Sequence, residues 1–236
     1  MSRRLGPRGA AAAGAAKLVN SLSRRLGRGS GTVAGGRVAL ALDPRLLERE
    51  LADRHVFLVT GTNGKTTTTA LLRAALGRPS VSNATGSNMP PGLVAALISS
   101  PAEFAVLEVD ESWLGAVIDA SRTATSVTVV LLNLSRDQLD RSSEVRQLAL
   151  KWRGVLSDRE RSAFVTVVAN VNDPLVSYAA ENAVRLIACA VPVVWRLDAT
   201  SCPRCTRSLV FEPTGDWSCQ CGLARPRFAT AARQSI

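Results

Sequence analysis

The segment that most constrains the fold of this chain is residues 56–69, where an apolar run passes directly into a glycine-rich loop. Val56 to Thr60 is typical of a buried strand, and the loop Gly-Thr-Asn-Gly-Lys-Thr at residues 61–66 then opens a helical segment. Glycines let backbone N–H groups turn toward a phosphate, and a helix start adds partial positive charge. Lys65 supplies a point charge, and the Thr66 hydroxyl suits Mg²⁺. This strand, loop and helix predict a nucleoside triphosphate site, although the loop is shorter than the common GxxxxGK[ST] form.

From residue 55 onward, short apolar runs alternate with amphipathic segments. The apolar runs are nearly continuous, as in Val127 to Leu132, which is typical of a parallel sheet covered on both faces. We therefore predict an α/β fold, with a mostly parallel sheet sandwiched by helices, for residues 55–199. The expected strands are 56–60, near 80, 104–109, 126–132, 164–169 and 185–189, and the expected helices are 65–76, 90–99, 111–119, 143–156 and 174–183.

Residues 1–54 carry much of the net charge of +10, because no Asp or Glu precedes Asp43. Two interpretations are open: an arginine-rich transit peptide, or a basic helix near residues 11–26 that belongs to the fold. After it, the Ser-Gly and Gly-Gly pairs at residues 30–36 indicate a break. Residues 37–42 then read as a strand, and Asp43 is expected to cap a helix with Pro44 in its first turn.

Polar residues follow three of the predicted strands. Because ligands gather at the carboxyl ends of parallel strands, these residues are candidates for holding Mg²⁺ or orienting the reacting groups, with capping or solvated acids as the alternative. They are Glu108, Asp110 and Glu111 after the third strand, Asn133, Asp137 and Asp140 after the fourth, and Asn170, Asn172 and Asp173 after the fifth.

Four of the five cysteines, Cys202, Cys205, Cys219 and Cys221, lie within twenty residues. A local cluster in a chain with ample apolar residues favours a metal site over a disulfide framework. We predict a small ribbon at residues 200–224 with a structural Zn²⁺, packed on Leu209, Phe211 and Trp217. The fifth, Cys189, ends an apolar run and is expected to be buried.

These segments together resemble the Mur ligase superfamily, and within it the MurT type. Gly61 to Thr68 looks like the family's ATP loop, and residues 85–89 and 107–111 resemble its next two motifs. Residues 132–141 carry an Arg-Asp-Gln-Leu-Asp-Arg run similar to the MurT form, with Gln138 where most Mur ligases have His. Residues 170–174 resemble the adenosine motif, with Asn172 in place of the usual Asp. The cysteine segment resembles the ribbon inserted in MurT proteins, although its second pair is Cys-x-Cys.

The resemblance implies ATP-dependent amidation of the D-glutamate α-carboxylate in the lipid II stem peptide, through an acyl phosphate. It also implies a heterodimer with a GatD-type glutaminase that supplies ammonia, and a cytoplasmic location at the inner face of the plasma membrane, reached through the lipid substrate. The implied catalytic residues are Lys65, Glu108 and Asn133. The implied ATP-binding residues are Gly61, Thr62, Asn63, Gly64, Lys65, Thr66, Thr67, Asn170 and Asp173, and Mg²⁺ would lie on Thr66 and Glu108.

Other functions stay open at this stage. A different Mur-type or folylpolyglutamate-synthase-like ligase would use the same loop with an amino acid in place of ammonia. A nucleic-acid-binding module would use the basic arm, but the ribbon lacks interleaved basic and aromatic residues, so no nucleic-acid partner is expected. A truncated ATP-binding form is also open, because ligases of this type continue into a C-terminal domain, whereas residues 225–236 read only as a tail.

Overall fold

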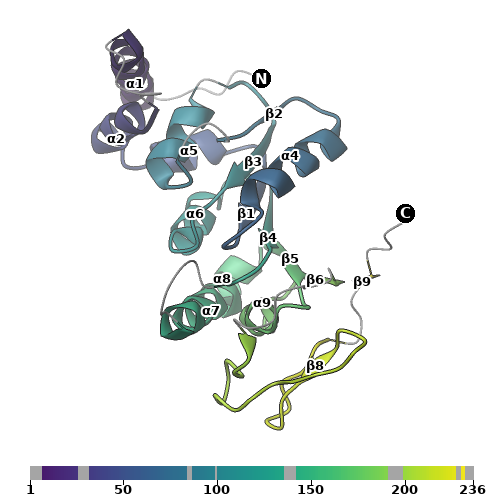
Figure 1. The fold of residues 1–236 in the computed structure, drawn as a ribbon. Coiled ribbons are helices and arrows are strands. Elements are labelled where there is room, and N and C mark those ends of the chain that lie inside the picture. Colours follow the sequence, from purple (N-terminus) through teal and green to yellow (C-terminus); the bar gives the residue numbers. More distant parts are fainter. Residues whose placement is uncertain are drawn as a thin grey trace. The chain divides into compact units, whose positions relative to one another are not determined.

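The structure is a computed structural model, and it describes residues 7–25, 32–83, 87–98, 100–135, 142–190, 199–226 and 230–231. The chain divides into two compact units (Figure 1). The first unit contains residues 1–59 and 66–127, and the second contains residues 60–65 and 128–236. The glycine-rich loop is therefore grouped with the second half of the chain, and the helix that follows it with the first.

The first unit is a parallel α/β layer. Its strands lie in the order β2 (Ser80–Val81), β3 (Phe104–Glu108) and β1 (His55–Thr60). Both strand pairs are parallel, with His55 level with Phe104 and Val59 level with Glu108. Four of the five residues of β3 are buried, as expected for a central strand covered on both faces. The helices of this part are α1 (Pro7–Arg25), α2 (Thr32–Leu42), α3 (Leu46–Leu51), α4 (Lys65–Leu76), α5 (Pro90–Leu97) and α6 (Leu114–Ala120).

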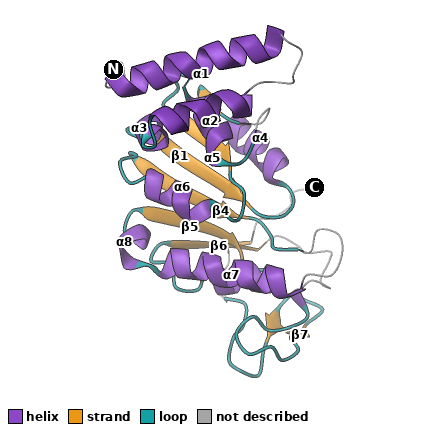
Figure 2. Ribbon diagram, turned by 90° about the vertical axis from the view of Figure 1, so that its left-hand side faces the viewer, coloured by secondary structure: helices purple, strands orange, loops and turns teal. Residues whose placement is uncertain are grey.

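The basic N-terminal segment forms the predicted helix, α1, which packs against α2 (Figure 2). The strand expected at residues 37–42 is wrong, because these residues form the second half of α2. Gly36 lies inside this helix, where a Cβ atom would come within 1.8 Å of the Pro91 carbonyl oxygen. The glycine therefore serves close packing of α2 on α5 and does not break the helix.

The expected cap at Asp43 is also wrong in detail. Helix α3 begins after Arg45, and no side chain caps it. The buried Asp43 instead accepts a hydrogen bond from the Arg45 N–H at 3.2 Å and forms an ion pair with Arg49 at 3.5 Å. Its carboxylate thus fixes the turn before α3.

A fully buried arginine, Arg54, joins the elements around the start of β1. Its Nε donates to the Glu50 carbonyl at 2.7 Å, and its Nη1 donates to the Ala102 carbonyl at 2.6 Å. Nη2 lies 2.9 Å from the Ser100 carbonyl and 3.5 Å from a Glu50 carboxylate oxygen. A buried guanidinium is tolerated only when its N–H groups are paired in this way.

The second unit repeats the α/β pattern. Its strands lie in the order β4 (Ser126–Leu131), β5 (Val165–Asn170), β6 (Leu186–Ala190) and β9 (Thr230–Ala231), and β6 is parallel to both β5 and β9. Helices α7 (Ser142–Ser157), α8 (Arg159–Ser162) and α9 (Pro174–Ala180) accompany them, with α7 packed on α9. Trp152 of α7 and Trp217 are its largest fully buried side chains. The predicted strands and long helices are therefore present, whereas α8 and β9 were not predicted.

The predicted ribbon is present as an antiparallel pair, β7 (Val210–Phe211) with β8 (Trp217–Ser218). Leu209 and Trp217 are buried, and Phe211 is half-buried. Cys189 is half-buried in β6, so the expectation of full burial is wrong. Its strand pairs with β5 on one side and with the two-residue β9 on the other.

Within the described ranges, no helix combines the length and apolar character that a membrane crossing requires.

The Arg54 network predicts a large loss of stability for Arg54→Met. The substitution removes a buried guanidinium that is bound to the Glu50 carboxylate and to several carbonyls, so the free energy of unfolding should fall by about 3 kcal/mol. Arg122→Met, which removes an ion pair with Asp119 that is exposed on both sides, should cost less than about 1 kcal/mol. Urea unfolding followed by circular dichroism measures both, and equal losses would contradict the role given to Arg54.

Candidate functional site

The glycine-rich loop follows β1 and leads into α4, as predicted. Gly61 has a φ of +143°, a conformation that other residues rarely adopt. A Cβ atom there would lie 2.9 Å from the Leu132 Cβ and 3.0 Å from the Asn133 nitrogen. The loop backbone therefore lies directly against the residues that follow β4, at a distance that only glycine allows.

Asn133 and Ser135 hold this loop through hydrogen bonds. The Asn133 side chain accepts from the Asn63 N–H at 3.0 Å and donates to the Asn63 carbonyl at 2.9 Å, as a paired strand would. The Asn133 carbonyl accepts from the Thr62 N–H at 3.0 Å. The Thr62 hydroxyl accepts from the Ser135 N–H at 3.0 Å, and the Asn63 side chain donates to the Ser135 hydroxyl at 3.0 Å. The structure thus gives Asn133 a loop-holding contact, and its catalytic role stays a prediction.

Lys65 is the first residue of α4. Its ammonium group donates hydrogen bonds to the carbonyl oxygens of Gly61 and Thr62, the second at 3.3 Å. The cation therefore lies over the loop that precedes it. This is where a phosphate cradled by the loop would need a compensating charge.

The first unit contains two further predicted site residues, Thr66 and Glu108. The Thr66 hydroxyl donates to a carboxylate oxygen of Glu108 at 3.0 Å. Glu108 is only 8 % exposed, and its other oxygen, Oε1, has no hydrogen-bond donor among the described residues. A hydroxyl beside a buried carboxylate oxygen that lacks a partner fits the oxygen ligands that Mg²⁺ prefers. The structure thus brings Thr66 and Glu108 into contact, and their role as Mg²⁺ ligands stays a prediction.

The buried Asn83, which was not among the residues predicted from the sequence, positions Glu108. Its side chain accepts from the Glu108 N–H at 2.8 Å and donates to the Glu108 carbonyl at 2.9 Å. A further hydrogen bond to the Ser87 carbonyl, at 3.1 Å, ties Asn83 to the start of the next segment. The available signal was a polar residue just after β2, but that strand is only two residues long.

The other two predicted acids after β3, Asp110 and Glu111, lie in the turn that follows the strand. Asp110 accepts hydrogen bonds from the Ser112 N–H, at 3.0 Å, and from its hydroxyl, and its own N–H donates to the Asn88 carbonyl. Glu111 is half-buried in the same turn. Asp137, Asp140, the rest of the Arg-Asp-Gln-Leu-Asp-Arg run and the segment 84–86 lie outside the described residues.

The turn at residues 170–173 joins three elements of the second unit. Asn170 donates to the Leu132 carbonyl at 3.2 Å. Asp173 is the N-cap of α9, where its carboxylate accepts from the N–H groups of Leu175 and Val176. Its other oxygen accepts from the Leu134 N–H at 2.8 Å. Asp173 therefore anchors the turn, and its role as a ribose ligand stays a prediction.

The four ribbon cysteines converge as predicted, with their sulfur atoms all within 4.8 Å of one another. Sγ atoms of Cys202 and Cys221 are 3.6 Å apart, and those of Cys205 and Cys219 are 3.5 Å apart. The short Cys-x-Cys turn closes because Gly222, at a φ of +86°, donates its N–H to the Cys219 carbonyl at 3.0 Å. The cluster can hold a metal ion.

The thiols of this cluster differ in acidity. Burial raises the pKa of Cys202 to about 12. The Leu223 N–H, which stabilises the thiolate, is the main cause that lowers the pKa of Cys221 to about 7. Metal ions bind thiolates, so Cys221 is a readier metal ligand than Cys202, whose thiolate needs a cation nearby.

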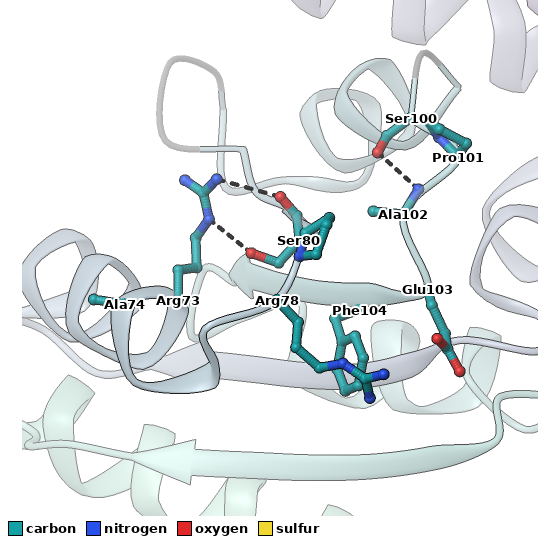
Figure 3. Close-up of a pocket in the computed structure, with 10 residues that line it drawn as sticks. Arg73, Ala74, Arg78, Ser80, Ser100, Pro101, Ala102, Glu103 and Phe104 are labelled. Atoms are coloured by element: carbon teal, nitrogen blue, oxygen red, sulfur yellow. Dashed lines mark hydrogen bonds between the residues drawn. The ribbon is translucent and has the colours of Figure 1, made fainter.

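A separate hollow of about 770 Å³ lies at the opposite end of β3 from Glu108 (Figure 3). Arg73, Arg78 and Phe104 line it, with the Arg78 guanidinium 5.2 Å from the centre of the Phe104 ring. Arg73 is bound to the Ser80 hydroxyl at 3.1 Å. This hollow, which no sequence motif predicted, lies at the starts of β2 and β3 and is not part of the candidate site.

A family model described as the Mur ligase middle domain matches residues 59–191, more than half of the chain. The chain belongs to the Mur ligase family. The predicted membership is therefore confirmed, and the matched region contains the loop, Glu108, Asn133 and the turn at 170–173.

Among its curated relatives, the chain is similar to lipid II isoglutaminyl synthase (glutamine-hydrolyzing) subunit MurT of Staphylococcus aureus (strain COL). The two are 30 % identical over 237 residues, which cover 89 % of this chain and 51 % of the relative. The corresponding subunit of Streptococcus pneumoniae (strain ATCC BAA-255 / R6) is 33 % identical over 160 residues, 64 % of this chain and 34 % of that protein. The chain spans about half the length of the first of these relatives. The predicted MurT type is confirmed by these matches.

A more distant likeness links the chain to UDP-N-acetylmuramoylalanine–D-glutamate ligase of Bordetella parapertussis (strain 12822 / ATCC BAA-587 / NCTC 13253). The identity is 30 % over 122 residues, 51 % of this chain and 23 % of that protein. One group of relatives is thus named as subunits of a synthase, and the other as a ligase.

The contact of Gly61 with the end of β4 predicts that Gly61→Ala destabilises the protein. An added methyl group must displace backbone atoms and strain φ, so the free energy of unfolding should fall by about 2 kcal/mol. Gly154→Ala, in α7 with open space around its Cβ position, should instead be neutral or stabilising by up to about 1 kcal/mol. Thermal unfolding compares the two, and equal melting temperatures would refute the close approach.

Proposed function

We propose that this chain binds ATP and Mg²⁺ and transfers the γ-phosphoryl group to a carboxylate, as part of a ligase that amidates the D-glutamate α-carboxylate of the lipid II stem peptide. The observation that carries the proposal is the loop at 61–65, fixed by Asn133 and followed directly by Thr66, which contacts Glu108. The likeness to MurT subunits supports the choice of substrate.

The residues have separate tasks in this proposal. The N–H groups of the loop and the start of α4 bind the phosphates, and Lys65 turns from the loop carbonyls to the β- and γ-phosphates. Thr66 and Glu108 would hold Mg²⁺, which neutralises charge on the phosphates when it is bound. Asn170 and Asp173 would contact the adenosine.

The chemistry follows from the poor reactivity of a carboxylate toward ammonia. A carboxylate oxygen attacks the γ-phosphorus, the bond to the β-phosphate oxygen breaks, and ADP leaves. The acyl phosphate that forms is then attacked at its carbonyl carbon by ammonia. Inorganic phosphate leaves, and the nitrogen loses a proton to give the amide. Fixed N–H groups and Lys65 stabilise the charge that moves during the first step.

The ammonia source is part of the same proposal. The MurT relatives are named as subunits of a glutamine-hydrolyzing synthase, so we propose a GatD-type glutaminase as the partner of this chain. Ammonia released by such a partner would replace free ammonium, which is scarce as the unprotonated nucleophile at neutral pH.

We also propose that the four cysteines hold a structural zinc ion. Four sulfurs at about 2.3 Å from zinc lie roughly 3.8 Å apart in a tetrahedron. The 3.5 and 3.6 Å contacts of the cluster are close to that spacing. The zinc site would stabilise the ribbon and take no part in the reaction.

Lys65→Ala tests nucleotide binding. The variant should bind ATP with Mg²⁺ at least about 10-fold more weakly, because the loop loses its cation. Lys151→Ala, which removes an exposed lysine of α7, should bind as the unaltered chain does. Isothermal titration calorimetry measures the affinity, and absence of binding by the unaltered chain would refute the proposal.

Amidation itself is tested with lipid II, ATP and either ammonium or glutamine with a GatD-type glutaminase. Mass spectrometry of the stem peptide should show the carboxyl group replaced by an amide, together with phosphate release. Phosphate release that requires an amino acid and not ammonia would favour a different Mur-type or folylpolyglutamate-synthase-like ligase. Nucleotide binding without either reaction would indicate an ATP-binding form that lacks full ligase activity.

Metal analysis of the purified chain tests the zinc site. We expect about one zinc ion per chain, and its loss in Cys219→Ser. Cys189→Ser, which alters the cysteine outside the cluster, should retain the metal. Zinc-free protein with four freely titratable ribbon thiols would contradict the assignment.

A further inference from the structure

The ribbon contains a tryptophan that contacts the nucleotide half of the second unit. Trp217, in β8, is 2 % exposed, and its indole N–H donates to the Val171 carbonyl at 3.0 Å. Trp217 lies two residues before Cys219, one of the four clustered cysteines. A side chain fixed by the ribbon thus supplies a hydrogen bond to a turn outside it.

Val171 lies in the turn that carries the predicted adenosine-binding residues Asn170 and Asp173. The same turn is bonded to the Leu132 carbonyl and the Leu134 N–H. These two residues flank Asn133, which pairs with Asn63 of the phosphate loop. Direct contacts therefore run from Trp217 through the turn to the phosphate loop, all within the second unit.

The ribbon has little regular secondary structure of its own. Its two strands, β7 and β8, contain two residues each. Cys202 and Cys219 are themselves buried, so the cluster occupies the centre of the ribbon. Small modules of this kind depend on their metal for folding. The place of Trp217 should depend on the same metal.

Other contacts attach the ribbon elsewhere. Arg146 of α7 donates to the Pro203 carbonyl at 3.0 Å, and Arg204 lies 2.5 Å from a Glu181 carboxylate oxygen. Arg153 contacts the other Glu181 oxygen at 2.7 Å. Partial burial raises the pKa of Glu181, but these two arginines outweigh it and hold the pKa below its ordinary value. Attachment of the ribbon therefore has other supports, whereas the Trp217 hydrogen bond goes to the turn itself.

We infer that Trp217 is a positioning residue for nucleotide binding: the metal-bound ribbon fixes the turn at 170–173 through the hydrogen bond from the Trp217 indole to the Val171 carbonyl. The inference rests on the proposed function, because it assumes that this turn contacts adenosine. According to this inference, the ribbon increases the affinity for nucleotide in addition to stabilising the protein. The metal content of the cluster then becomes a determinant of how tightly the chain binds ATP.

Trp217→Phe tests the inference because it keeps an aromatic ring and removes only the N–H donor. The variant should bind ADP with Mg²⁺ roughly 3- to 10-fold more weakly, the effect of one buried hydrogen bond. Its metal content should stay unchanged. Arg146→Gln is the matched control, since it removes a ribbon contact that does not involve the turn. Its nucleotide affinity should equal that of the unaltered chain.

Titration calorimetry and metal analysis on the same samples separate the outcomes. A Trp217→Phe variant that keeps its metal, melts at a lower temperature and binds ADP normally would show a purely structural role and overturn the inference. An equal loss of nucleotide affinity in Arg146→Gln would also overturn the inference.

If Trp217→Phe does not fold, the unaltered chain is compared before and after removal of metal by a chelator. The metal-free chain should lose at least the same factor in affinity, and unchanged affinity overturns the inference. Failure of the unaltered, metal-loaded chain to bind ADP or ATP would instead refute the proposed function.

Discussion

The close contact between the phosphate loop and the end of β4 is the constraint on which the rest of the candidate site depends. Gly61 brings the loop backbone against Leu132 and Asn133, where no side chain fits. The next two residues can then pair with the Asn133 backbone and side chain. The loop therefore has a fixed shape before any ligand arrives, so little ordering entropy remains to be lost on binding.

Hydrogen bonds from a polar side chain to the backbone of a neighbouring segment also occur at other strand ends. Asn83 pairs with the backbone of Glu108 much as Asn133 pairs with that of Asn63, and Asp173 accepts the Leu134 N–H. Each side chain makes backbone hydrogen bonds of the kind that a neighbouring strand would make if the sheet continued. A buried backbone group without a partner costs free energy, so these residues also stabilise the fold. Polar residues at the carboxyl ends of the strands thus shape the site even where they touch no ligand.

Most of the fold between residues 55 and 190 could be predicted, because apolar runs of strand length alternate with helical segments. The glycine-rich loop also shows where one strand ends and the next helix begins. Residues 37–42 were assigned wrongly because the packing partner of Gly36 lies far along the chain, at Pro91. Asn83 was missed because a two-residue strand gives no periodicity. Asn133 and Asp173 were found by type and position, but their contacts depend on how separate turns meet, which local sequence does not encode.

The contact of Gly36 with Pro91 also bears on how this sequence can change. A glycine inside a helix weakens it by about 1 kcal/mol relative to alanine, so such positions are common targets for stabilising substitutions. Gly14, in α1, has open space around its Cβ position and is suited to that replacement. At Gly36 the same change would force two backbones apart. Two helical glycines that look equivalent in a sequence therefore differ in evolutionary freedom, and only the tertiary contact tells them apart.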